Sequence, residues 1–196
     1  MSSSLPAAAP PVAPAPSRRP LGQFLLVAAA LYLLWLLGYE RALGPAGHLD
    51  EALSRNLAAA GSGLLRLLGF ATAPDPAQPR LLLMDGQPGV WVGDPCNGLV
   101  LYALFAGFVL ALPGGGWRRK AAFIPAGVGA LYLLNVLRVA ALALNHHYYR
   151  QSVDFNHHYT FSFVVYGAIL LLWGWWVRHL PRPTAPVAGP PVSPAA

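Results

Sequence analysis

The chain has 196 residues, of which 56% are hydrophobic and only 10% are charged. Soluble domains contain about 25% charged residues, so this composition is typical of a membrane protein made of one small bundle. The net charge of +6 does not indicate nucleic-acid binding, because the basic residues are scattered beside apolar runs and do not gather on one soluble face. A single cysteine excludes a disulfide framework.

Both ends of the chain differ in composition from the middle. Residues 1–20 and 181–196 are rich in proline and alanine and cannot bury enough apolar surface to order themselves, so we expect disordered cytoplasmic tails. Residues 21–180 are expected to form a single integral-membrane domain. Its first span is residues 21–39, close to the roughly 20 residues that cross a hydrocarbon core. Arginines precede this span and Glu40 follows it, which places the N-terminus in the cytoplasm.

Residues 48–70 have the pattern of an amphipathic helix. Apolar residues recur there at spacings of three and four, at Leu49, Leu53, Leu57, Ala60, Leu64 and Leu67. We expect this helix to lie at the membrane interface or to pack on the bundle, with a bend or break at residues 61–63. A short re-entrant segment over residues 57–70 is the alternative.

A small external β-hairpin is expected between this helix and the second span. Residues 71–79 are predicted to be a turn-rich linker. Residues 81–84 and 90–92 are short apolar strands, and the turn between them opens with Asp-Gly. The second strand leads directly to the only cysteine, Cys96.

Three further apolar runs complete the bundle, at residues 96–112, 121–144 and 159–177. A basic turn (113–120) separates the first two, and a polar, aromatic loop (145–158) separates the last two. With the tails and the basic turn in the cytoplasm, all seven acidic residues fall outside. The prediction is an all-α membrane protein with about four transmembrane helices, located in the cytoplasmic (inner) membrane with both termini inside.

This topology brings three chemically distinct groups to the outer side of the membrane. Cys96 opens the second span, and His157 and His158 open the fourth. Arg138 lies about 9 Å below the end of the third span, at 1.5 Å per residue. An arginine inside a membrane helix costs about 2.5–3.5 kcal/mol at the centre, so it is expected to serve a function there.

The surroundings of Arg138 favour a face turned into the bundle. Asn135 precedes it by three residues, and Leu142 and Asn145 follow at spacings of four and three, so these residues share one side of the helix and form a polar stripe there. Snorkelling of the arginine toward the outer headgroups is the alternative.

Cys96 and the histidines suggest thiol chemistry. A free cysteine is often only a small buried hydrophobe, but a neighbouring guanidinium or imidazolium favours the thiolate, and a helix beginning at Cys96 adds the positive end of its dipole. Arg138, supported by Asn135 and Asn97, is expected to hold a developing oxyanion. Histidine is the usual general acid or base near neutral pH.

A metal site is a competing interpretation of the histidines. The pairs His146-His147 and His157-His158 would supply its ligands, with Cys96 as a further one. Their spacing matches no standard zinc signature, and thiolate–imidazole catalysis needs no metal. We therefore expect no metal and no other cofactor.

Three short sequences occur in a fixed order: Cys96-Asn97-Gly98, NVLRV at residues 135–139, and NHHYTF at residues 156–161 with Tyr166 downstream. Together they resemble the exosortase/archaeosortase family of multi-span membrane cysteine transpeptidases. The family pattern is a cysteine opening one helix, an arginine in the next and a histidine opening the one after, and it covers about residues 93–176. Two features depart from it, because many members have about eight spans and many carry a small residue where Asn97 stands.

The resemblance implies a catalytic role for each matching residue. Cys96 is then the nucleophile, Arg138 stabilises the thiolate or oxyanion, and His157 or His158 is the acid/base, with His157 favoured by its spacing to Phe161 and Tyr166. The implied substrates are exported proteins with a C-terminal sorting tail that ends in a membrane helix. They would be cleaved at the outer face of the bilayer and transferred to an unknown surface acceptor.

Two rival functions remain open from the sequence. In the first, the chain is a non-enzymatic assembly subunit in which Arg138 pairs with a partner's helix and Cys96 only packs. In the second, it is a metal- or haem-handling membrane protein that uses the histidine pairs.

Overall fold

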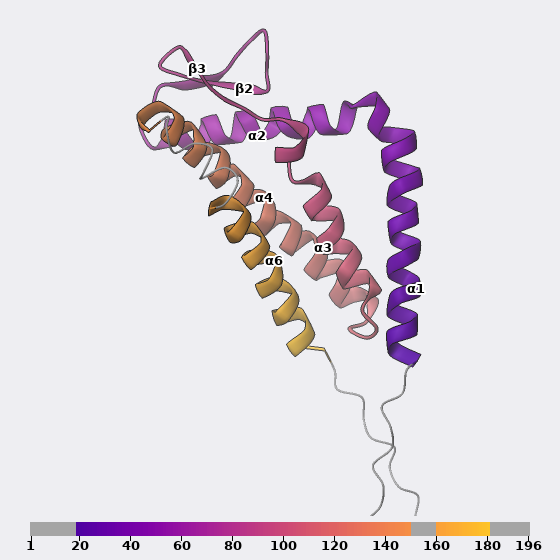
Figure 1. The fold of residues 1–196 in the computed structure, drawn as a ribbon. Helices are drawn as coiled ribbons and strands as arrows, with labels where there is room; N and C mark the ends of the chain where they lie inside the picture. Colours follow the sequence, from indigo (N-terminus) through magenta and orange to yellow (C-terminus); the bar gives the residue numbers. More distant parts are fainter. Residues whose placement is uncertain (1–18, 150–159, 181–196) are drawn as a thin grey trace, which may run out of the picture.

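The computed structural model describes residues 19–149 and 160–180. In this part of the chain, long apolar helices run along one another and a further helix with a small sheet lies across one end of them (Figure 1). The prediction of a mostly helical membrane protein is therefore confirmed. The two predicted tails lie outside the described residues, except for residues 19 and 20, so their disorder stays a prediction.

The first span is longer than expected. Helix α1 (Arg19–Leu34) continues into a π-helical stretch, η1 (Trp35–Leu43), and a 3₁₀ turn, η2 (Gly44–Ala46). Together Leu21–Ala46 form one of three helical segments in the described residues that are long and apolar enough to cross a membrane. The helical stretch contains Gly38 and continues through it, and no proline occurs after Pro20 until Gly44-Pro45, where the helix changes to a 3₁₀ turn.

The other predicted spans differ in length from one another. Helices α4 (Trp117–Tyr148) and α6 (Phe161–Arg178) are both long enough to cross a membrane. Helix α3 (Leu99–Ala111) is apolar but has only 13 residues. Within residues 19–149 and 160–180, the structure therefore gives three full-length candidate spans and one short apolar helix, where the sequence predicted about four spans.

Helix α2 (His48–Leu67) lies across the ends of the long helices (Figure 1). This arrangement agrees with a helix packed on the bundle and not with the re-entrant alternative. The predicted break at residues 61–63 is wrong, because α2 is continuous there. The predicted apolar face is also partly wrong, since Leu49 and Leu67 are 50% and 87% exposed.

The buried face of α2 is made mostly of small residues. It consists of Ser54, Leu57, Ala58, Gly61, Ser62 and Leu65. A Cβ atom on Gly61 would lie 2.9 Å from Val139 Cγ1 of α4, so α2 and α4 approach closely at this point. Small side chains allow two helices to come close, and here they decide the buried face more than the leucines do.

Strands β1 (Thr72–Pro74), β2 (Leu81–Met84) and β3 (Gln87–Trp91) form an antiparallel sheet in the order β1-β2-β3. The predicted hairpin is confirmed. Its turn is tighter than expected, because Asp85 and Gly86 both adopt positive φ angles, of 51° and 73°, as a two-residue hairpin requires. Strand β1 was missed, since it lies in the segment predicted to be linker.

Two groups of buried apolar residues hold these elements together. The first group joins α2, the sheet and the second half of α4, and includes Leu57, Leu65, Leu82, Val92, Val136 and Val139. The second group joins α3, α4 and α6, and includes Phe105, Val109, Leu131, Val165, Ile169 and Trp176. On α4, Asn135 and Arg138 fall where one group gives way to the other, so polar side chains enter the molecule at this level.

Candidate functional site

Cys96 lies in a tight turn between the sheet and α3. Residues Asp94–Cys96 form a 3₁₀ turn, η3, in which the N–H of Cys96 donates to the carbonyl of Gly93 at 2.9 Å. Cys96 is half-buried. The prediction that a helix begins at Cys96 is wrong, because α3 begins at Leu99. Residues 94–97 are referred to below as the Cys96 turn.

Gly98 makes the change of direction from the Cys96 turn into α3 possible. Its φ of 82° is left-handed, a conformation that glycine adopts without strain. A Cβ atom there would lie 2.8 Å from the hydroxyl oxygen of Tyr102 and 3.1 Å from Nδ2 of Asn135. Only glycine therefore fits at this position, for two separate reasons.

Arg138 approaches the thiol directly. Its Nη2 atom lies 3.9 Å from Sγ of Cys96, although the two residues are 42 apart in the sequence. Both side chains are half-buried. A guanidinium this close to a sulfur favours the thiolate over the thiol, and the thiolate is the nucleophilic form of cysteine.

Asn135 fixes the backbone of the same residue. Its Nδ2 donates to the carbonyl oxygen of Cys96 at 3.0 Å, and the side chain is buried, with 5% exposure. Asn135 lies one helical turn before Arg138, so both residues point from one face of α4. Helix α4 thus contacts Cys96 twice, at its carbonyl and at its sulfur.

Asn97 is turned away from the thiol. It is 1% exposed, its Nδ2 donates to Oδ1 of Asp50 at 2.6 Å, and its Oδ1 accepts from the N–H of Leu99 at 2.9 Å. Both polar ends of the side chain therefore bond to the protein. This geometry links the Cys96 turn to α2 on one side and to the first turn of α3 on the other.

The histidines fall into two groups. His157 and His158 lie outside the described residues, so their roles stay predictions. His146 and His147 belong to the last turn of α4 and not to the predicted loop. Nε2 of His147 lies 3.6 Å from Oδ2 of Asp85 in the hairpin turn. Within residues 19–149 and 160–180, no three potential metal ligands of the types His, Cys, Asp and Glu come together.

Two charged contacts of the Cys96 turn could not be predicted from the sequence. Asp50 of α2 accepts from Asn97 and also from the hydroxyl of Tyr39 in η1. Arg80, just before β2, donates to Oδ1 of Asp94 at 2.7 Å. Each pair joins residues on different elements, and only the fold brings them together.

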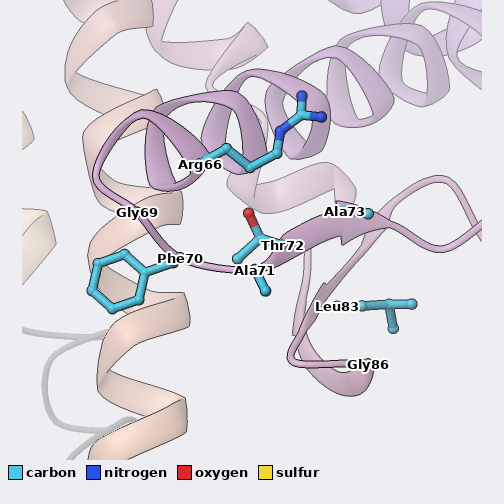
Figure 2. A pocket seen from close by; sticks show the side chains of 8 residues that line it. All are labelled: Arg66, Gly69, Phe70, Ala71, Thr72, Ala73, Leu83 and Gly86. Atoms are coloured by element: carbon cyan, nitrogen blue, oxygen red, sulfur yellow. The ribbon is translucent and has the colours of Figure 1, made fainter.

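A separate hollow of about 530 Å³ lies at the other end of α2, between the helix end and the sheet (Figure 2). Arg66 lines it from the helix, and Phe70, Thr72 and Leu83 line it from the segments that follow. Of the predicted site residues that the structure describes, Cys96, Asn97, Asn135 and Arg138, none borders it. At 1.5 Å per residue, Arg66 lies about 24 Å along α2 from Asp50, so this hollow is distinct from the Cys96 region.

Comparison with known proteins gives one match. The family model described as transmembrane exosortase matches residues 43–175. This range contains the Cys96 turn, Asn135, Arg138 and both predicted histidines. The searches of curated proteins and of solved structures returned no significant match.

Proposed function

Because the chain belongs to the transmembrane exosortase family, we propose that it is a membrane cysteine peptidase or transpeptidase with Cys96 as its nucleophile. The observation that carries this proposal is the 3.9 Å approach of Arg138 to the Cys96 sulfur. A charged arginine in an apolar helix is costly, and its position beside the only thiol of the chain gives it a chemical purpose.

The first step of the proposed reaction forms an acyl-enzyme. The Cys96 thiolate attacks a peptide carbonyl carbon, and the negative charge passes from sulfur to the carbonyl oxygen. Arg138 stabilises the thiolate before attack and the oxyanion after it. When the C–N bond breaks, the leaving amine takes a proton from His157 or His158, and a thioester to Cys96 remains.

The second step releases the acyl group. The same histidine, now neutral, removes a proton from the incoming acceptor, which attacks the thioester and returns Cys96 to the thiolate. Water as the acceptor gives hydrolysis, and a surface molecule gives transfer. His157 is favoured over His158 on its spacing to Phe161 and Tyr166.

The proposed substrates are exported proteins that carry a C-terminal sorting tail with a membrane helix. A substrate helix in the bilayer is confined to two dimensions, so its scissile bond reaches the Cys96 turn without a deep soluble pocket. The acceptor is proposed to be a molecule of the cell surface. The proposed location is the cytoplasmic membrane, with both termini inside and the Cys96 turn facing outward.

Orientation is tested with two introduced cysteines in a Cys96→Ala background. Gln87, on the sheet, and Trp117, at the start of α4, are both exposed and lie at opposite ends of the helices. In intact cells or spheroplasts, a membrane-impermeant maleimide should label Gln87→Cys and should label Trp117→Cys only after the membrane is opened. The reverse pattern would overturn the proposed orientation.

The reaction itself is tested with purified protein in liposomes that also contain membrane proteins with a C-terminal helix. Mass spectrometry would search for substrates shortened at the C-terminus and for an acyl adduct on the Cys96 peptide. Cys96→Ala should abolish both. Loss of a general acid/base typically costs about 10²–10⁴ in rate, so one of His157→Ala and His158→Ala should be nearly inactive.

His147→Ala is the matched control for the histidine variants, because His147 contacts Asp85 and not the thiol. Its processing rate should stay near that of the wild type. Arg138→Lys, which keeps the charge, should retain more activity than Arg138→Met. Undiminished processing by Cys96→Ala would overturn the proposal and favour the assembly-subunit alternative. Loss of activity on chelation would favour the metal alternative.

A further inference from the structure

We propose that Asp50 is a positioning residue for the Cys96 thiol, acting through Asn97. This inference rests on the proposed function, because it explains how the proposed nucleophile, Cys96, is held beside Arg138. Asp50 belongs to the first turn of α2 and is 46 residues away from Cys96 in the sequence. It is half-buried, and its two carboxylate oxygens accept from Asn97 and Tyr39, so we assign it a positioning role and not a catalytic one.

The contact between Asp50 and Asn97 is short and partly buried. Nδ2 of Asn97 donates to Oδ1 of Asp50 at 2.6 Å, and Asn97 is 1% exposed. A hydrogen bond to a charged carboxylate is shorter and about twice as strong as one between neutral groups. It therefore holds the side chain of Asn97 in one orientation.

Asp50 is itself held in place by a second donor. Its Oδ2 atom accepts from the hydroxyl of Tyr39, which lies in η1. The two oxygens of one carboxylate thus tie the end of the first span to the Cys96 turn. Since α2 also packs on α4, Asp50 is anchored to the same framework that carries Arg138.

Asn97 transmits this anchoring to Cys96. Its Oδ1 accepts from the N–H of Leu99, so the side chain also fixes the start of α3. Cys96 is the adjacent residue, and its carbonyl is held from the other side by Asn135 at 3.0 Å. The Cys96 turn is therefore fixed between α2 and α4. Release of the α2 side would change the distance between the sulfur and Arg138.

The test is an exchange of the two hydrogen-bonding groups, read out by the rate at which N-ethylmaleimide alkylates Cys96 in reconstituted protein. Cys96 is the only cysteine, so the label reports a single site. In Asn97→Asp, two carboxylates face each other and repel, so the turn should move and the alkylation rate should change several-fold. In Asp50→Asn/Asn97→Asp, an amide of residue 50 donates to residue 97, and the rate should return toward that of the wild type.

The double variant Glu51→Gln/Asn97→Asp is the matched control. Glu51 is the adjacent acidic residue and is exposed, so this variant has the same net charge as the exchange without the contact. It should keep the altered rate of Asn97→Asp. Asp50→Asn alone should stay near the wild-type rate, because the new side-chain oxygen can still accept from Asn97.

Two results would overturn the inference. In the first, Asp50→Asn/Asn97→Asp does not restore the wild-type alkylation rate: its rate differs from that of the wild type as much as the rates of Asn97→Asp and Glu51→Gln/Asn97→Asp do. In the second, Asn97→Asp alone is alkylated at the same rate as the wild type. The alkylation assay needs no substrate, so it tests the role of Asp50 independently of the proposed function. A failure of the proposed function is seen in the processing assay instead, as full processing by Cys96→Ala.

Discussion

Replacement of Gly98 by alanine should disturb the Cys96 site more than any ordinary glycine substitution. Gly98 has a φ of 82°, and an added Cβ would lie 2.8 Å from the hydroxyl oxygen of Tyr102. The same Cβ would lie 3.1 Å from Nδ2 of Asn135, the group that donates to the carbonyl of Cys96. The substitution therefore combines backbone strain with displacement of a site residue.

The expected magnitude follows from these two causes. A left-handed conformation costs an L-residue about 1–2 kcal/mol. Forcing an extra methyl group into a packed region costs about 1–3 kcal/mol more. The total, about 2–5 kcal/mol, corresponds to a fall in melting temperature of roughly 4–20 °C for a chain of this size.

Gly47→Ala separates the two causes. Gly47 also has a positive φ, of 66°, but an added Cβ there would meet nothing within 4 Å. It should show only the conformational cost of about 1–2 kcal/mol. The assay is thermal unfolding of both variants in the same detergent, followed by tryptophan fluorescence, together with the alkylation rate of Cys96. If Gly98→Ala unfolds no earlier than Gly47→Ala and alkylates at the wild-type rate, the contact of Gly98 with Tyr102 and Asn135 does not support the site.

Two further predictions concern residues of α4 that contact α3. Gly127→Ala would place a Cβ 2.2 Å from the ring of Phe105 and should destabilise the protein by about 1–3 kcal/mol. Gly129→Ala is the control, because its Cβ would meet nothing within 4 Å, and it should stabilise the protein by up to about 1 kcal/mol. Equal melting temperatures of the two variants would contradict this prediction. Lys120 donates to the carbonyls at the end of α3 at 2.9 and 2.7 Å, so Lys120→Met should cost about 1.5–3 kcal/mol in the same unfolding assay. Arg119→Met is the control, because Arg119 is exposed and its substitution should change stability by less than about 0.5 kcal/mol. An equal loss of stability in both variants would refute a role for the Lys120 contacts.

The sequence predicted the helical membrane architecture because membrane composition and span length are strong, local signals. It also predicted that α4 presents Asn135 and Arg138 on one face, since helical spacing alone determines this. The predicted small hairpin was confirmed because Asp85-Gly86 specifies a two-residue turn between apolar strands. In each case, residues within a few turns of one another carry the information.

The missed features depend on contacts between distant segments. The buried face of α2 could not be predicted from its leucines, because Gly61 allows Val139 of α4 to approach and so selects a face of small residues. The role of Asp50 could not be predicted from the helical pattern of residues 48–70, because its partner Asn97 lies 47 residues away. Strand β1 was missed because it has only three residues, two of which, Ala73 and Pro74, are uncommon in strands, and because it pairs with β2 seven or more residues further along the chain.

The length of α3 connects the fold to the chemistry. A helix that crossed the whole hydrocarbon core would need about 20 residues, about seven more than α3 has, and its N-terminal end would lie about 10 Å further along the helix axis. Cys96 would then pass the level of Arg138, and the 3.9 Å approach of the two side chains would be lost. Because α3 is short, the Cys96 turn can contact α2 through Asn97 and the polar face of α4 through Cys96. The same feature that weakens α3 as a membrane span therefore brings the thiol to the guanidinium.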